Sequence, residues 1–154
     1  MPEPVVESVT ISATAEALYD LVSDVARMGE WSPEAIGARG AGERLTVGNG
    51  FVGFNRRGPV IWWTYCRVLQ AERGRRFAFD VDFGPIALSR WTYEFQATPD
   101  GGTKVVETWL DRREGLVGLP VKALGQILIP GDRAAHNRAS MRTTLERLKL
   151  AAEA

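Results

Sequence analysis

The sequence predicts an α+β domain in which a curved antiparallel sheet packs against one long C-terminal helix. Three observations predict it. Residues 132–154 contain neither Gly nor Pro and place apolar side chains along one stripe of a helix. The middle of the chain alternates apolar and polar residues between short turn sequences. A strand-like segment and two short helix-like segments precede this middle region.

The chain begins with a strand that two short helices follow. Val5–Ile11 is rich in β-branched residues and is the predicted first strand. Ser12 or Thr14 can accept a hydrogen bond from a free backbone N–H and so cap the first helix. Apolar residues then recur at the spacing of one helix face: Leu18, Leu21, Val22 and Val25. Asp24 can begin a second short helix, whose end Pro33 marks.

From residue 36 to residue 111 the chain consists of strands that short turns join. The predicted strands are Ile36–Val47, Phe51–Arg57, Val60–Ala71, Arg76–Phe83, Ala87–Thr98 and Thr103–Asp111. The strongest turn signal is the Pro-Asp-Gly-Gly sequence of residues 99–102. Because short turns can join only antiparallel neighbours, these six strands form a meander. With the first strand, the sheet has about seven strands.

Two strands reveal which of their faces is apolar, and three do not. The clear faces are Phe77, Phe79, Val81 and Phe83 on one strand and Trp91, Tyr93 and Phe95 on the next. For Val60–Ala71 the inward set is Trp62, Thr64, Cys66 and Val68, or Trp63, Tyr65 and Arg67. For Thr103–Asp111 it is Val106, Thr108 and Leu110, or Val105, Glu107 and Trp109. For Phe51–Arg57 it is Phe51 and Asn55, or Phe54 and Arg56.

The last helix, Asp132–Ala154, has one narrow apolar stripe. Four side chains fall within about 40° of Met141 on a helical wheel: Ala134, Leu145, Leu148 and Ala152. Asn137 is the clearly polar member of this stripe, whereas His136 lies roughly 140° from Met141. A strongly curved sheet cannot close along the whole of such a helix. We therefore expect a gap between sheet and helix that aromatic side chains line.

The amino-acid composition limits the kinds of partner and cofactor that the protein is expected to bind. The 154 residues and 45% hydrophobic content fit one domain, residues 1–154, with a sizeable core. Lys+Arg and Asp+Glu balance at 19 each, which argues against a nucleic-acid partner. Cys66 and His136 are the only residues of their types, so neither a disulfide nor a common zinc site is expected, and no metal or other cofactor is predicted. Neither a secretion signal nor a membrane span is recognisable, so we expect a cytoplasmic monomer or homodimer without stable membrane insertion.

Several stretches together resemble a known family. They are VTISATAEALYDLVSDVARMGEWSP, GFVGFNRRG, IWWTYCRVLQAERGRRFAFDV, TKVVETW and HNRASMRTTLERLKLAAE. The chain resembles, over essentially its whole length, the helix-grip fold of the SRPBCC (START-like) superfamily, in its bacterial polyketide cyclase/dehydrase-like branch. The resemblance implies a deep hydrophobic cavity between sheet and helix. The mouth of this cavity would lie at the loops around Trp31 and Phe83–Leu88 and at residues 115–131. Residues 115–131 would form either a lid helix or a packed segment that leads into the last helix.

Aromatic and polar residues are candidates for the wall of this cavity. The candidates are Trp31, Phe54, Trp63, Phe79, Phe83, Trp91, Tyr93, Trp109, Asn137 and Met141. Each of the aromatic residues has filling of the core as its alternative. Glu107 would be a carboxylate in an apolar wall if its face is the inner one, and its pKa would then rise, as suits a general acid or base. Otherwise Glu107 faces outward or pairs with an Arg.

These residues predict a protein that binds a small hydrophobic ligand, aromatic, polyketide-like or lipid-like, as a carrier or sensor. The alternative is a cyclase, aromatase or dehydratase that uses Glu107, Tyr93 and Asn137, with Arg90 or Arg67 steadying an enolate if either points inward. The catalytic residues are otherwise unknown. The enzyme hypothesis requires Glu107 and Tyr93 to point into one pocket.

Overall fold

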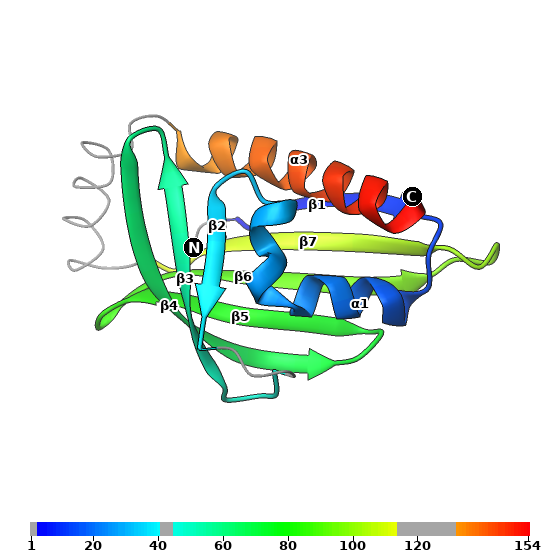
Figure 1. Cartoon of the computed structure of the whole chain (residues 1–154), viewed down its shortest axis with the longest axis horizontal. Coiled ribbons are helices and arrows are strands. Elements are labelled where there is room, and N and C mark those ends of the chain that lie inside the picture. Colours follow the sequence, from blue (N-terminus) through cyan, green and yellow to red (C-terminus); the bar gives the residue numbers. More distant parts are fainter. Residues whose placement is uncertain (1–2, 41–44, 114–131) are drawn as a thin grey trace.

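The computed structural model describes residues 3–40, 45–113 and 132–154, and its architecture is a curved sheet that holds a long helix (Figure 1). The strands are β1 (Val5–Ile11), β2 (Ala35–Arg39), β3 (Gly50–Arg57), β4 (Val60–Glu72), β5 (Arg76–Phe83), β6 (Ile86–Ala97) and β7 (Thr103–Asp111). The helices are α1 (Ala15–Ser23), the 3₁₀ helix η1 (Val25–Glu30) and α3 (Arg133–Glu153). The sheet order is β1-β7-β6-β5-β4-β3-β2, and all neighbours are antiparallel. The predicted helix-grip fold is confirmed.

Local chemistry fixes the N-terminal elements. The Thr14 hydroxyl accepts from the backbone N–H of Ala17 at 3.2 Å, so Thr14 and not Ser12 caps α1. Asp24 precedes η1, but its side chain makes no capping hydrogen bond. The predicted second helix is therefore present as a 3₁₀ helix that ends at Glu30, three residues before Pro33.

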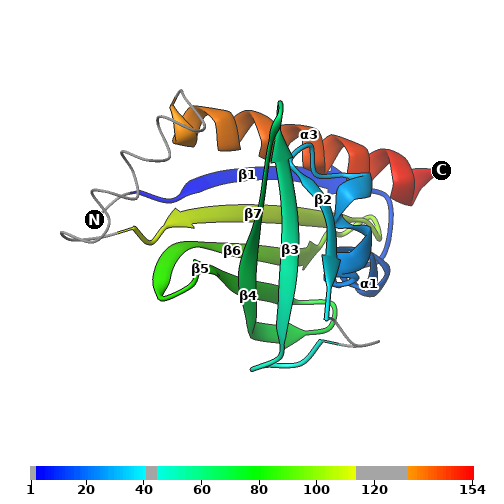
Figure 2. The ribbon, with the colours of Figure 1, turned by 60° about the vertical axis from the view of Figure 1, so that its left-hand side comes forward.

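The sheet bends strongly between β5 and β2. Figure 2 shows β1, β7 and β6 running along α3, whereas β4, β3 and β2 cross that direction. The register shifts between Val68 and Gln70 on β4 and between Ala35 and Gly37 on β2, and such irregularities bend a strand. β2 is shorter than the predicted Ile36–Val47 and ends at Arg39. The next residue, Gly40, has φ of 82°, a left-handed conformation that does not continue a strand.

The structure decides two of the three faces that the sequence left open, and on the third, β3, both rows contribute to the cavity. On β4 the inward residues are Thr64, Cys66 and Val68, all buried. On β7 they are Val105, Glu107 and Trp109. On β3 Phe51 is buried in the core and Arg56 is exposed, but Phe54, from the same row as Arg56, also lines the cavity.

The core lies under the C-terminal half of α3. Leu145 and Leu148 pack in one cluster with Leu18 of α1 and with Phe77 and Phe95 of the sheet. Met141, one turn earlier on α3, packs instead with Val5, Trp91 and Trp109. The predicted stripe is thus buried from Asn137 to Leu148, with Thr144 as an additional member. Because α1 fills the sheet only at this end, the N-terminal half of α3 has room beneath it.

Among the helices that the structure describes, none is long and apolar enough to cross a membrane. The predicted lid or lead-in of residues 115–131 lies outside the described residues.

Candidate ligand-binding site

A cavity of about 640 Å³ lies between the sheet and the N-terminal half of α3. This volume is within the usual range of small-molecule sites. Its wall is mainly aromatic and aliphatic, and includes Met28, Phe51, Phe54, Trp62, Phe79, Val81, Leu88, Trp91, Trp109 and Met141. Polar side chains on the wall come from β3, β4, β6, β7 and α3, and from residues outside these elements such as Glu3, Glu34 and Arg113. The cavity wall is therefore mainly apolar, but it also carries both neutral polar and ionisable side chains.

Most of the predicted cavity residues lie on this wall. They are Phe54, Phe79, Trp91, Tyr93, Trp109, Asn137 and Met141, and the weak catalytic candidate Glu107 lies there as well. Trp31, Trp63 and Phe83 lie elsewhere.

These three aromatics have different surroundings for identifiable reasons. Trp31 is buried in the core after η1, and the guanidinium of Arg27 lies 5.3 Å from its ring centroid. Trp63 is 51% exposed because β4 turns the alternate row, with Thr64, inward. Phe83 is 48% exposed at the end of β5, past a register shift between Val81 and Asp82, where strand alternation no longer fixes direction.

Glu107 and Tyr93 form a buried pair on the cavity wall. They are directly opposite each other on β7 and β6, and the Tyr93 hydroxyl donates to Oε2 of Glu107. Glu107 is 1% exposed, and its other oxygen, Oε1, is buried without a hydrogen-bond partner. The pair came together because both residues occupy the inward rows of neighbouring strands.

The environment keeps this pair uncharged near neutral pH. Burial raises the pKa of Glu107 to about 8, against the lowering effect of the Tyr93 hydrogen bond, and Glu7 raises it further. Burial and the adjacent Glu107 raise the pKa of Tyr93 well above its usual value. Since Tyr93 donates to Oε2, the carboxyl proton of neutral Glu107 is on Oε1, available to a group in the cavity.

A second polar cluster lies where α3 begins. Glu34 accepts from Arg133 and lies 2.8 Å from Nε2 of His136. Asp132 caps the helix by accepting from two backbone N–H groups of the first turn. Arg133 Nη1 and Asn137 Nδ2 are buried without a partner, and both residues line the cavity.

Sequence reasoning found Asn137 and missed its neighbours in this cluster. Arg133 lies roughly 80° from Met141 on the helical wheel, at the border of the apolar stripe. This position could have identified Arg133 as a candidate for the cavity wall. No local sequence pattern could have identified Glu34, because its contacts with α3 form only when the fold brings distant residues together. His136, predicted to lie away from the apolar stripe, does so as the partner of Glu34.

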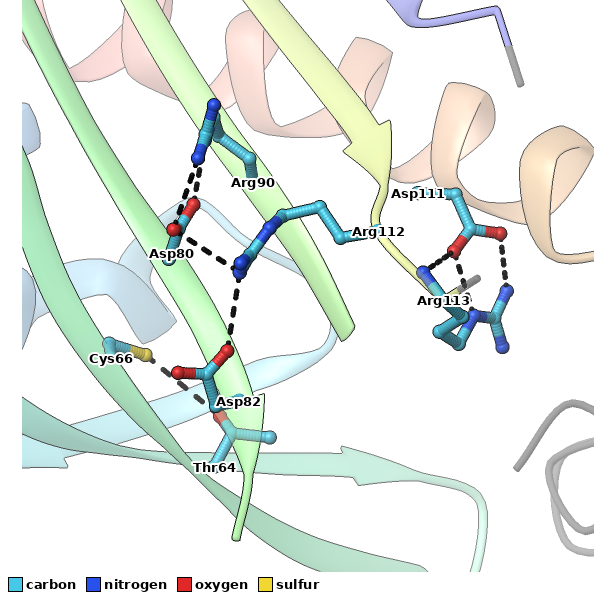
Figure 3. A network of polar contacts seen from close by, with 8 residues as sticks. All are labelled: Thr64, Cys66, Asp80, Asp82, Arg90, Asp111, Arg112 and Arg113. Atoms are coloured by element: carbon cyan, nitrogen blue, oxygen red, sulfur yellow. Dashed lines mark hydrogen bonds and ion pairs between the residues drawn. The ribbon is translucent and has the colours of Figure 1, made fainter. Parts of the chain in front are cut away.

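The two arginines considered for an enolate do not face the cavity. Arg67 is exposed. Arg90 donates through Nε to Oδ1 of Asp80 at 2.7 Å, on the outer face of the sheet (Figure 3). Nη1 of Arg112 lies 3.2 Å from Asp80 and 3.2 Å from Asp82. Asp80, whose side chain is 3% exposed, is therefore a structural anchor between β5, β6 and the end of β7.

Of two further groups on the cavity wall, one is ion-paired and the other is an unreactive thiol. Arg113 donates to Asp111, the last residue of β7, at 2.9 Å (Figure 3), and both residues line the cavity. Burial raises the pKa of Cys66 to about 12, so its thiol stays protonated and is a poor nucleophile. Its sulfur lies 4.0 Å from the Thr64 hydroxyl.

Comparisons with known proteins agree with this geometry. A family model described as polyketide cyclase / dehydrase and lipid transport matches residues 3–153. A polyketide-cyclase-like protein from Corynebacterium glutamicum is 28% identical, with a TM-score of 0.64 over 97% of this chain and 91% of that one. A Deinococcus radiodurans protein has a TM-score of 0.68 at 17% identity over 98% of both chains. The di-domain ARO/CYC StfQ of the steffimycin biosynthetic pathway has a TM-score of 0.67 at 18% identity over 97% of this chain and 44% of its own. No curated protein sequence matched.

Proposed function

This chain belongs to the polyketide cyclase/dehydrase and lipid transport family, and we propose that it binds a small hydrophobic ligand, aromatic, polyketide-like or lipid-like, as a carrier or sensor. The ligand occupies the cavity between the sheet and α3. Family membership and neighbours from biosynthetic pathways support a ligand-binding or polyketide cyclase-like role.

The observation that carries this proposal is the cavity itself. Burial of roughly 300 Å² of apolar ligand surface would contribute about 7 kcal/mol before the cost of association. One neutral hydrogen bond contributes only about 1 kcal/mol. Affinity therefore comes mainly from the aromatic wall, and the polar groups select and orient the ligand.

The proposal is tested with native mass spectrometry of freshly purified protein and with displacement of the neutral fluorophore Nile red. We expect a co-purifying mass or saturable Nile red binding, and Ser140→Trp, which fills the cavity from α3, should abolish it. Ala139→Trp places the same bulk on the exposed side of α3 and is the matched control. Binding that Ser140→Trp and Ala139→Trp affect equally would contradict the proposal.

The buried pair of Glu107 and Tyr93 favours a second candidate, a cyclase-, aromatase- or dehydratase-type enzyme. Neutral Glu107 can protonate a carbonyl or a departing hydroxyl through Oε1, and its ionised form can accept a proton from carbon. Tyr93 holds the carboxyl in place, and Asn137 offers a donor to a substrate oxygen.

This candidate predicts turnover that binding does not require. A 3-hydroxyacyl N-acetylcysteamine thioester is the probe, and its dehydration is followed by the absorbance of the unsaturated thioester. Glu107→Gln should abolish this reaction while it leaves Nile red binding within about twofold. Absence of turnover in the wild-type protein, with binding intact, would leave the carrier or sensor as the function.

A further inference from the structure

We propose that the ligand carries a neutral acceptor oxygen, such as the carbonyl of a ketone, ester or amide, which Arg133 and Asn137 bind at the N-terminal end of α3. This inference rests on the proposed binding function and specifies the ligand's polar group and its place in the cavity.

Unpartnered polar atoms gather in the cavity. Within residues 3–40, 45–113 and 132–154, three buried side-chain polar atoms lack a hydrogen-bond partner: Glu107 Oε1, Arg133 Nη1 and Asn137 Nδ2. All three residues line the same cavity. A buried polar atom without a partner costs folding free energy, so such atoms are rare unless a ligand or water completes them. Their concentration around one cavity indicates that the missing partner is the occupant of that cavity.

Arg133 and Asn137 are placed to hold one atom together. They are four residues apart on α3, so they lie on the same face in adjacent turns. Asn137 is 2% exposed. Arginine has no acceptor, and the buried atom of Asn137 is its amide nitrogen, so both groups can only donate. Two donors on one face of the helix can be satisfied together by an acceptor oxygen of the ligand.

The surrounding charges favour a neutral acceptor over a carboxylate. The charge of Arg133 is balanced by Glu34, its partner at the cavity. Among the residues that the structure describes, the other cation on the wall is Arg113, which is paired with Asp111. The remaining carboxylates at the cavity include Asp132, which already occupies the positive end of α3 as its cap, and Glu3. An entering carboxylate would therefore lose its hydration without meeting an uncompensated cation among residues 3–40, 45–113 and 132–154, whereas a neutral carbonyl has less hydration to lose.

A matched series of naphthalenes tests this preference at pH 7 by displacement of Nile red. The probes are 2-acetylnaphthalene, which has a neutral carbonyl, 2-naphthoic acid, which is ionised, and 2-ethylnaphthalene, which has no acceptor. We expect the ketone to bind about tenfold more tightly than the hydrocarbon and the carboxylate to bind no better than the hydrocarbon.

Asn137→Leu identifies the donor. We expect it to weaken the ketone by about tenfold and to leave 2-ethylnaphthalene within about twofold. Thr144→Val is the control, because Thr144 also lines the cavity on α3 but its hydroxyl already donates to the carbonyl of Ser140. It should leave the ratio of ketone to hydrocarbon affinity unchanged. Asn137→Leu should also raise the denaturant midpoint, since it removes an unpartnered buried amide, and this shows that the variant is folded.

The outcomes separate this inference from the proposed function. Tightest binding by 2-naphthoic acid would overturn the neutral-acceptor assignment and leave the hydrophobic-ligand function intact. Equal weakening of all three probes by Asn137→Leu would overturn the role of Asn137. If no probe displaces Nile red and no ligand co-purifies, the binding function fails and this inference fails with it.

Discussion

Replacement of Glu107 by Gln should stabilise the folded protein at neutral pH. Glutamine keeps an oxygen that accepts from the Tyr93 hydroxyl and imitates the neutral carboxyl at the same size. In the wild-type protein the folded-state pKa of Glu107 is raised to about 8 from 4.5. The folded state therefore binds more protons than the unfolded state between these two values. Stability is full below about pH 4.5, declines as the pH rises, and levels off above about pH 8.

The size of the effect follows from this pKa difference. One pKa unit corresponds to about 1.4 kcal/mol of free energy. At pH 7 the wild-type protein should have lost roughly 3 kcal/mol of unfolding free energy through Glu107 alone. Glu107→Gln does not titrate, so it should exceed the wild type by about this amount at pH 7 and match it near pH 4.

The assay is urea unfolding of both proteins at a series of pH values from 4 to 8.5. Glu94→Gln is the control for loss of a carboxylate, because Glu94 pairs with Arg76 on the outer face of β6 and is half-buried. Its effect should stay under about 1 kcal/mol. If the unfolding free energies of wild type and Glu107→Gln run parallel from pH 5 to pH 8, Glu107 is not held neutral by burial and the reasoning is wrong.

Three further predictions follow from the same structure. Tyr93→Phe removes the hydrogen bond that lowers the pKa of Glu107, so in the same urea titrations the decline in stability should still begin near pH 4.5 but continue to a higher pH than in the wild type; a decline that ends at the same pH would contradict this. Leu148→Ala, in the filled core, should lower the unfolding free energy by about 2–5 kcal/mol, and Met141→Ala, beside an existing cavity, by an amount at the low end of that range; equal losses in urea would show that the cavity does not border Met141. Cys66, whose pKa burial raises to about 12, should remain unmodified by iodoacetamide at pH 7.5 in the native protein but react in urea, as mass spectrometry would show; rapid modification of the native protein would contradict its burial.

Local sequence patterns were sufficient to predict the strands and the long helix of this fold. The predicted first strand, Val5–Ile11, has the bounds of β1, and α3, Arg133–Glu153, lies within the predicted 132–154. Both predictions rest on periodicity and on turn or capping residues, which act over a few neighbouring positions. The order of these elements, with short turns between the strands, then left few ways to pack the helix on the sheet.

The site was predictable only in part, because a strand with apolar residues in both rows does not reveal its inner face. On β4, Trp62 and Trp63 are equally apolar, yet Trp62 lines the cavity and Trp63 is exposed. The register of β4 with the neighbouring strands determines which of its two rows faces the cavity. Trp31 likewise is of a residue type expected on a cavity wall, but it packs in the core.

The sequence by itself determined the sheet, the long helix and the apolar stripe that carries Asn137, since each follows from the spacing of nearby residues. Tertiary structure decided that Glu107 faces inward against Tyr93 and that Glu34, 99 positions before Arg133, neutralises it at the cavity. Those contacts join residues far apart along the chain, and no local pattern encodes them. The same contacts set the pKa of Glu107 and leave the donors of Arg133 and Asn137 for a ligand.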